Sequence, residues 1–268
     1  YFITKLKKIM LCFKEMITEN FGSEQKIETE QLQKSLETLE CLITQQLRLL
    51  KDTIFRYLTT MLIIKEVCVD SLSDAISAEK NGANRIELCS RLDKDGLTPS
   101  RKLTRDSFNL LKIPIRVMIR PKHPSFVYSE NEISEMIKEI NYCKKIGVDG
   151  VVFGCLDNNF NFNMSQINLL SEIAKPLNVI IHKSIDSTNS VTESLSKIIK
   201  NKNINGVLSS GGHRFAKDAV KTLKKMLDLS PENFEIICAG GITFENFNFL
   251  HKKINAKHYH GKKIINIK

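Results

Sequence analysis

Ile63-Ile64-Lys65-Glu66-Val67-Cys68-Val69 is the first of eight short β-rich runs in this chain, and helical segments separate each run from the next. Such alternation favours a parallel sheet covered by helices. The predicted strands are Ile63–Val69, Arg85–Cys89, Ile115–Arg120, Gly150–Gly154, Asn178–Lys183, Gly206–Ser210, Phe234–Ala239 and Lys257–His260. Eight strands predict closure into a (β/α)8 barrel of the TIM type. A doubly wound open sheet is the structural alternative.

The segment before the barrel has a different pattern. Apolar residues recur at intervals of three and four between Glu30 and Leu58, which predicts an amphipathic helix. We therefore expect two parts, a helical extension over residues 1–60 and a barrel over residues 61–268. Only eight residues follow His260, too few for an eighth covering helix. Our hypothesis is that the helix at Leu32–Leu58 covers the gap between the first and last strands.

Composition limits the class of protein. The chain has 268 residues, of which 42% are hydrophobic and 26% charged, as in an ordinary globular protein, and it has no apolar stretch long enough to cross a membrane. The odd number of cysteines, seven, argues against a disulfide framework, so we expect a cytoplasmic protein. The net charge of +10 comes without aromatic interleaving or a nucleic-acid-binding motif, so no nucleic-acid partner is expected.

Two neighbouring predicted strands carry the same small pattern, Glu66-Val67-Cys68 and Glu87-Leu88-Cys89. Because strand side chains alternate, each glutamate shares a face with its cysteine, and the barrel interior is the face that can hold a carboxylate. Cys68 and Cys89 are then soft ligands suited to Cu(I), with Met118 or His182 as additional donors. Two inert core cysteines are the alternative interpretation.

Other polar residues fall at the expected carboxyl ends of strands, where barrel enzymes keep their sites. With Glu66 and Glu87, they form a candidate catalytic set of Arg120, Asp157, His182, Asp186 and His260. Positioned carboxylates and imidazoles act as general acids and bases, so this set could transfer protons on a sugar, a sugar phosphate or a carbonyl compound. Structural hydrogen bonding is the alternative role for any one of them.

Two glycine pairs follow the sixth and seventh predicted strands, Gly211-Gly212 and Gly240-Gly241. Glycines let backbone amides approach an anion, and barrels often bind phosphate in this region. A small-molecule anion is therefore a candidate ligand. Tight turns between strand and helix are an equally good explanation of the glycines.

An ordered series of motifs resembles the CutC copper homeostasis family. It runs from about Glu66 to Gly261 through EVCVDS (66–71), GANRIELCS (82–90), DGLTPS (95–100), VMIRP (117–121), FVYS (126–129), GVDGVVFG (147–154), SSGG (209–212), AGGIT (239–243) and YHG (259–261). The resemblance implies a cytosolic barrel that binds or handles copper, with Cys68 and Cys89 matching the suggested Cu(I) ligands. It also implies a tendency to oligomerise. The family's final segment, which contributes to its interfaces, has no counterpart here, so a homo-oligomer is not carried over as an expectation.

Three functions thus remain open. The first is a copper-binding protein of this family. The second is a barrel enzyme acting by acid–base chemistry on an unidentified sugar or sugar phosphate. The third is an interaction module without a ligand.

Overall fold

The computed structural model describes residues 34–35, 37–39, 41–51 and 63–266, and the chain divides into two compact units, Tyr1–Met61 and Leu62–Lys268. All described residues of the first unit are helical. Both ends of the helix predicted at Leu32–Leu58 lie outside the described residues, so its role as a cover for the barrel stays a prediction. None of the helices in the described ranges is long and apolar enough to cross a bilayer.

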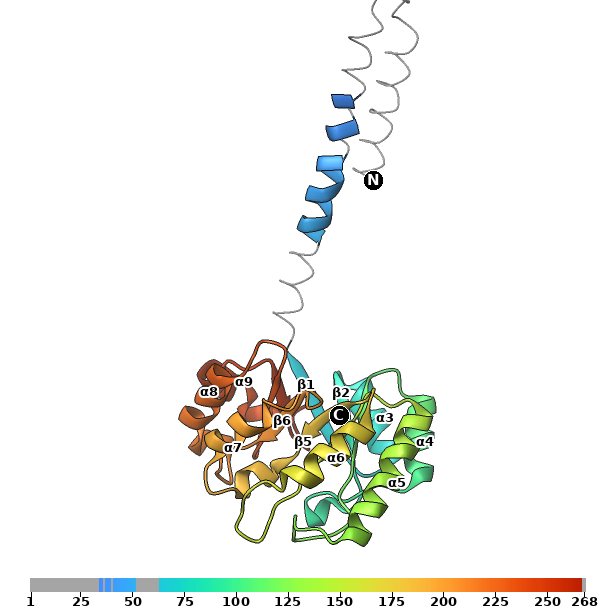
Figure 1. Cartoon of the computed structure of the whole chain (residues 1–268), viewed down its shortest axis with the longest axis vertical. Coiled ribbons are helices and arrows are strands. Elements are labelled where there is room, and N and C mark those ends of the chain that lie inside the picture. The colour runs from blue at the N-terminus through green and yellow to red at the C-terminus, as the bar shows by residue number, and fades with distance from the viewer. Residues whose placement is uncertain (1–33, 36, 40, 52–62, 267–268) are drawn as a thin grey trace, which may run out of the picture. The chain divides into compact units, whose positions relative to one another are not determined.

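The second unit contains eight parallel strands, each paired with its neighbours in chain order to form a closed barrel (Figure 1). They are β1 (Ile64–Val69), β2 (Arg85–Leu88), β3 (Ile115–Met118), β4 (Gly150–Phe153), β5 (Asn178–Ile181), β6 (Gly206–Ser209), β7 (Glu235–Cys238) and β8 (His258–His260). Pairing of β8 with β1, where Glu66 lies opposite His260, closes the ring. The predicted barrel is confirmed, and the open sheet is excluded.

The strand ends differ slightly from the prediction. Cys89, Arg120 and Lys183 were assigned to strands, but each lies beyond the last paired residue of its strand. At Cys89 the chain leaves the ladder and folds back, since Ser90 and Leu97 exchange two backbone hydrogen bonds of 2.8 and 2.7 Å. These three residues therefore lie in the connections that follow the strands, and Lys183 begins a short 3-10 helix.

Seven helices cover the strands in the described part of this unit. In Figure 1, α7, α8 and α9 lie at the left and α3, α4 and α5 at the right. Their bounds are α3 (Leu72–Lys80), α4 (Arg101–Leu110), α5 (Glu130–Ile146), α6 (Met164–Ala174), α7 (Val191–Ile198), α8 (Val220–Leu229) and α9 (Phe244–Ile254). Short 3-10 helices lie at η2 (Leu92–Lys94), η3 (Lys183–Ser187) and η4 (Ala216–Asp218). The ends follow local chemistry: α5 is capped at its start by Ser129, through a capping box, and at its end by Gly147, whose φ of 88° is left-handed.

No helix follows β8 in the described residues, which extend to position 266. Instead the chain runs beside the start of α9, where Phe244 N donates to Lys263 O at 2.7 Å. Ile264 and Ile265 are buried there. In the described part of this unit the outer ring thus has seven helices, as the sequence predicted.

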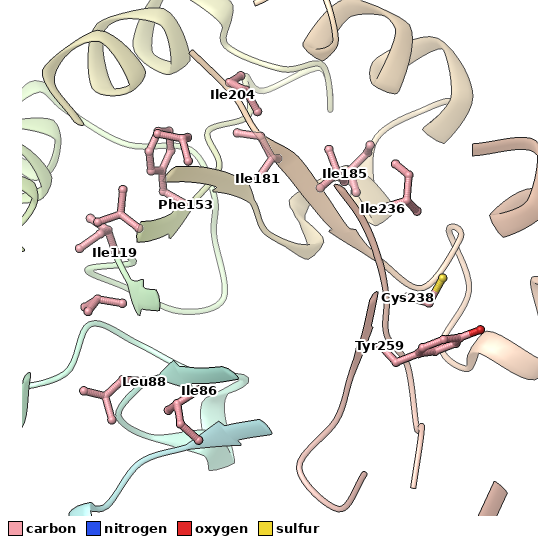
Figure 2. Close-up of a cluster of buried hydrophobic side chains, with 14 of the residues drawn as sticks. Ile86, Leu88, Ile119, Phe153, Ile181, Ile185, Ile204, Ile236, Cys238 and Tyr259 are labelled. Atoms are coloured by element: carbon pink, nitrogen blue, oxygen red, sulfur yellow. The ribbon is translucent and has the colours of Figure 1, made fainter. Parts of the chain in front are cut away.

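Two separate cores hold the barrel together. The larger lies between the strands and the helices, and Figure 2 shows part of it, including Ile86, Leu88 and Phe153. The smaller cluster lies in the barrel interior and consists of Cys68, Cys89, Met118, Val152, Ile180, Leu208, Ile237 and Ala239. On β2, Ile86 and Leu88 thus face the helices, while Cys89, of opposite parity, faces inward.

Candidate metal centre

The two cysteines of the repeated pattern meet inside the barrel. The register of β1 and β2 places Cys68 opposite Glu87, so Cys89 lies two residues further along the same face. Their Sγ atoms are nevertheless 3.6 Å apart. Cys68 is 7% exposed and Cys89 is fully buried. Gly96 crosses over Cys89, where a Cβ would be 3.1 Å from its sulfur and 3.8 Å from Met118 Cε, so the methionine borders the same space.

Two glutamates and one histidine surround the sulfurs. Cys89 Sγ lies 3.6 Å from Cys68 Sγ and 3.5 Å from Glu87 Oε2, so the single proton of the Cys89 thiol can be donated to either atom. His260 places Nδ1 2.8 Å from Glu66 Oε1 and Nε2 3.7 Å from Glu87 Oε2. Glu66 and Glu87 are both almost fully buried. Five predicted site residues thus form one buried cluster.

The contacts within the cluster favour a negative charge on one cysteine and a positive charge on the histidine. The hydrogen bond from Cys89 outweighs burial and, with His260, lowers the pKa of the Cys68 thiol to about 5. Burial raises the pKa of Glu87 well above its usual value. Burial alone would lower the pKa of His260, but the charge of Glu87 and the contacts with Cys68 and Glu66 raise it. At neutral pH this favours a Cys68 thiolate beside a His260 imidazolium, and the thiolate is the form that binds metals.

Two sets of three donor atoms could each hold a cation, since their atoms lie within 4.8 Å of one another. One is Cys68, Glu87 and Cys89, and the other is Glu66, Glu87 and His260. The first set contains two sulfurs, which select soft ions such as Cu(I). His182 fits less well as an added donor, because its Nδ1 accepts from Ser184 N at 3.1 Å. Its proton is then on Nε2, which leaves no lone pair for a metal.

Beneath the cluster lies a layer of ion pairs that the sequence analysis did not identify. Arg116 donates to both oxygens of Glu235 at 2.8 Å and to Asp149 at 2.9 Å. Arg85 pairs with Glu66 and, at 3.1 Å, with Glu235. The alternation of side chains along a strand would have indicated these residues. Arg85 precedes Glu87 by two positions and Arg116 precedes Met118 by two, so each points to the barrel interior as its partner does. The layer fixes Glu66, which in turn holds His260.

Arg120 and Asp186, two further predicted catalytic residues, are committed to loop structure. Arg120 Nη1 lies 3.3 Å from the carbonyl oxygens of residues 94–96, and the Arg120 guanidinium stacks over the ring of Phe126. Asp186 accepts from Ser209 Oγ at 2.6 Å and from Ser210 N at 2.9 Å. Neither residue is among the donors grouped around Cys68.

Asp157 is likewise occupied in its own loop, where it accepts from the backbone N–H groups of Asn159 and Asn161 at 2.8 and 2.9 Å.

The two glycine pairs differ in whether their backbone N–H groups have acceptors. Gly211 N donates to Ser209 Oγ and Gly212 N to Asp186 Oδ1, both at 2.9 Å. In the described structure the amides of Gly240 and Gly241 have no acceptor. Only the second pair therefore offers unpaired donors.

A family model described as the CutC family matches residues 63–265. A family protein CutC of Mesorhizobium japonicum is 32% identical over 201 residues, which cover 75% of this chain and 78% of the relative. A human protein named copper homeostasis protein cutC homolog is 33% identical over 197 residues, covering 74% and 72%. A crystal structure of CutC from Streptococcus agalactiae is similar with a TM-score of 0.72 at 26% identity, covering 76% of this chain and 100% of the other.

Proposed function

Because the chain belongs to the CutC family, we propose that it binds Cu(I) in the cytosol through the thiolates of Cys68 and Cys89. The observation that carries the proposal is the 3.6 Å separation of the two sulfurs. With a metal–sulfur distance of about 2.3 Å, as for zinc, both sulfurs can reach one ion without moving apart. Human and mouse relatives carry copper homeostasis in their names, which supports copper as the ion.

The surroundings of the sulfurs also favour a monovalent soft ion. Besides Glu87 and His260, the sulfurs have apolar neighbours in the interior cluster, which includes the thioether of Met118. Two thiolates and one Cu(I) carry a net charge of −1, which a His260 imidazolium would balance. Binding requires the loss of the thiol proton of Cys89, whose sulfur lies 3.5 Å from Glu87 Oε2.

A cytosolic location agrees with the state of the thiols. The six cysteines in the described residues are all free, and five of them are buried. Reduced cysteines are typical of the cytosol, and the proposed ligands bind the ion only when reduced.

The test is an anaerobic titration of the reduced full-length protein with Cu(I) against a chromophoric competing chelator. We expect one ion per chain and a loss of affinity of at least roughly a hundredfold for Cys68→Ser and for Cys89→Ser, the scale on which loss of a metal site's supporting groups acts. Cys143→Ala is the matched control, because Cys143 is a buried cysteine on α5, outside the interior cluster.

Folding of each variant is checked by circular dichroism, and X-ray absorption counts the sulfur neighbours of the bound copper. Stoichiometric binding that persists in the Cys68→Ser/Cys89→Ser double variant would refute the proposal. Equal loss of affinity in Cys143→Ala would do the same.

A further inference from the structure

The cavity above Cys68 is much larger than an ion requires. It has a volume of about 980 Å³ and opens at the carboxyl ends of the strands. Cavities that bind small molecules have volumes of about 300–1,000 Å³. Cys68 and Glu87 line it, whereas Cys89 does not. A copper ion held by the two sulfurs would leave most of this space for a second ligand.

The lining of the cavity is rich in positive charge. Five basic side chains face three carboxyl groups: Arg120, Lys183, Arg214, Lys262 and Lys263 against Glu87, Asp95 and Asp186. Asp186 is bound to the loop after β6, and Glu87 belongs to the thiol cluster. Lys183 and Arg214 form no ion pair with any residue in the described ranges. Unpaired cations around a concave site raise the local concentration of anions.

Backbone donors without an acceptor in the described structure also line the cavity. Gly240 and Gly241 have φ values of +99° and +68°, and their N–H groups have no acceptor in the described structure. A Cβ on Gly241 would lie 2.7 Å from the Phe215 ring, so only glycine fits this turn. The turn leads into α9, an eleven-residue helix whose amino end favours negative charge. Exposed turn amides beside a helix start form concavities that bind anions.

The cavity lining also includes a buried donor without a partner in the described structure. His182 is 3% exposed, and its Nε2 forms no hydrogen bond within the described residues. Because Nδ1 accepts from Ser184 N, the proton is on Nε2. Burial and the nearby Arg120 charge lower the pKa of His182 to about 3, so the ring stays neutral. A neutral N–H suits a hydroxyl or carbonyl oxygen rather than a cation.

We propose that this cavity binds a phosphorylated small polyol or carbonyl compound, with the phosphate at Gly240 and Gly241 and an uncharged oxygen at His182. The main chains of Arg214 and Lys263 border this turn, and both residues line the cavity. Arg214 O would lie 3.1 Å from a Cβ on Gly240, and Lys263 pairs with Thr243 just after the glycines. The site uses neither sulfur, so it goes beyond copper binding and does not depend on it.

The test is calorimetric titration of the full-length protein at fixed ionic strength with inorganic phosphate, ribose 5-phosphate and ribose. We expect ribose 5-phosphate to bind more tightly than phosphate, and ribose not to bind measurably. Arg214→Gln and Lys263→Gln should each weaken both phosphate probes roughly tenfold, as loss of a charged hydrogen bond does. Lys252→Gln is the matched control, since this exposed lysine lies in the last turn of α9.

His182→Asn separates the two halves of the proposed site. Asparagine retains an acceptor for Ser184 N but lacks Nε2, so ribose 5-phosphate should weaken while inorganic phosphate is unaffected. Cys68→Ser should leave phosphate binding unchanged, which distinguishes this site from the copper site. Absence of binding by both phosphate probes would overturn the proposal. Wild-type affinity in Arg214→Gln and Lys263→Gln would overturn it as well.

Discussion

Arg116→Met removes the central cation from the ion-pair layer beneath the cysteines. The Arg116 side chain is 2% exposed, and it holds Glu235 through two bonds of 2.8 Å and Asp149 through one of 2.9 Å. Breaking a buried pair costs about 3–5 kcal/mol, because the partner is left as an uncompensated charge. Glu235 and Asp149 are 21% and 26% exposed, and Glu235 keeps Arg85. We therefore expect a loss of about 3 kcal/mol in the free energy of unfolding.

The loss should depend on pH. Burial alone raises the pKa of Glu235, but Arg116, with Arg85 and His258, outweighs it and holds that pKa below its usual value of 4.5. A carboxyl with a depressed folded pKa adds stability above its unfolded pKa and loses it as pH falls through the folded pKa. The variant lacks most of this contribution. The difference between the two proteins should therefore be largest near pH 7 and shrink below about pH 4.

The assay is urea unfolding of the full-length protein, followed by near-ultraviolet circular dichroism of packed tyrosines. Arg105→Met is the control, because Arg105 is 57% exposed and should change stability by no more than about 0.5 kcal/mol. Arg116→Lys should be intermediate, since it keeps the charge but not the paired bonds. A loss below about 1 kcal/mol in Arg116→Met, or one independent of pH, would refute the reasoning.

Three other outcomes are expected. The rate at which iodoacetamide alkylates Cys68 should rise with pH around 5, the pKa of this thiol. Burial raises the pKa of three other thiols to about 12, so they should stay unmodified: Cys143, Cys155 and Cys238. Peptide mass spectrometry measures the alkylation, and a midpoint of the Cys68 pH profile near 9 contradicts the prediction. Tyr259→Phe should cost about 1–3 kcal/mol of unfolding free energy in urea, because Ala256 N loses its buried acceptor at 2.9 Å; no change contradicts it. Asp186→Asn should speed amide hydrogen exchange at Ser210 and Gly212 roughly tenfold or more, because both amides donate to this carboxylate. Unchanged exchange rates at these two amides contradict the prediction.

The barrel itself followed from the sequence. The alternation of β-rich and helical runs is a local pattern, and it predicted the eight strands of the closed barrel and the seven helices that cover them. The alternation of side chains along the first strand also predicted that Glu66 and Cys68 face the barrel interior. The strand ends were less predictable, because the apolar character of the sequence does not stop where the pairing stops: Cys89 is itself apolar, and Arg120 directly follows Ile119. Where a ladder stops depends on its neighbours in the sheet.

The candidate site depended on tertiary structure. Only the register of β1 against β2 and the crossing of Gly96 bring the sulfurs of Cys68 and Cys89 within 3.6 Å. Pattern reasoning grouped Arg120 and Asp186 with Glu66 and Glu87, and only the structure shows the side-chain hydrogen bonds that hold both residues against neighbouring loops. It missed the pair of Arg116 and Glu235, which are 119 residues apart. Sequence periodicity assigns a side chain to a face, whereas closure and stagger of the whole ring decide which side chains on that face meet.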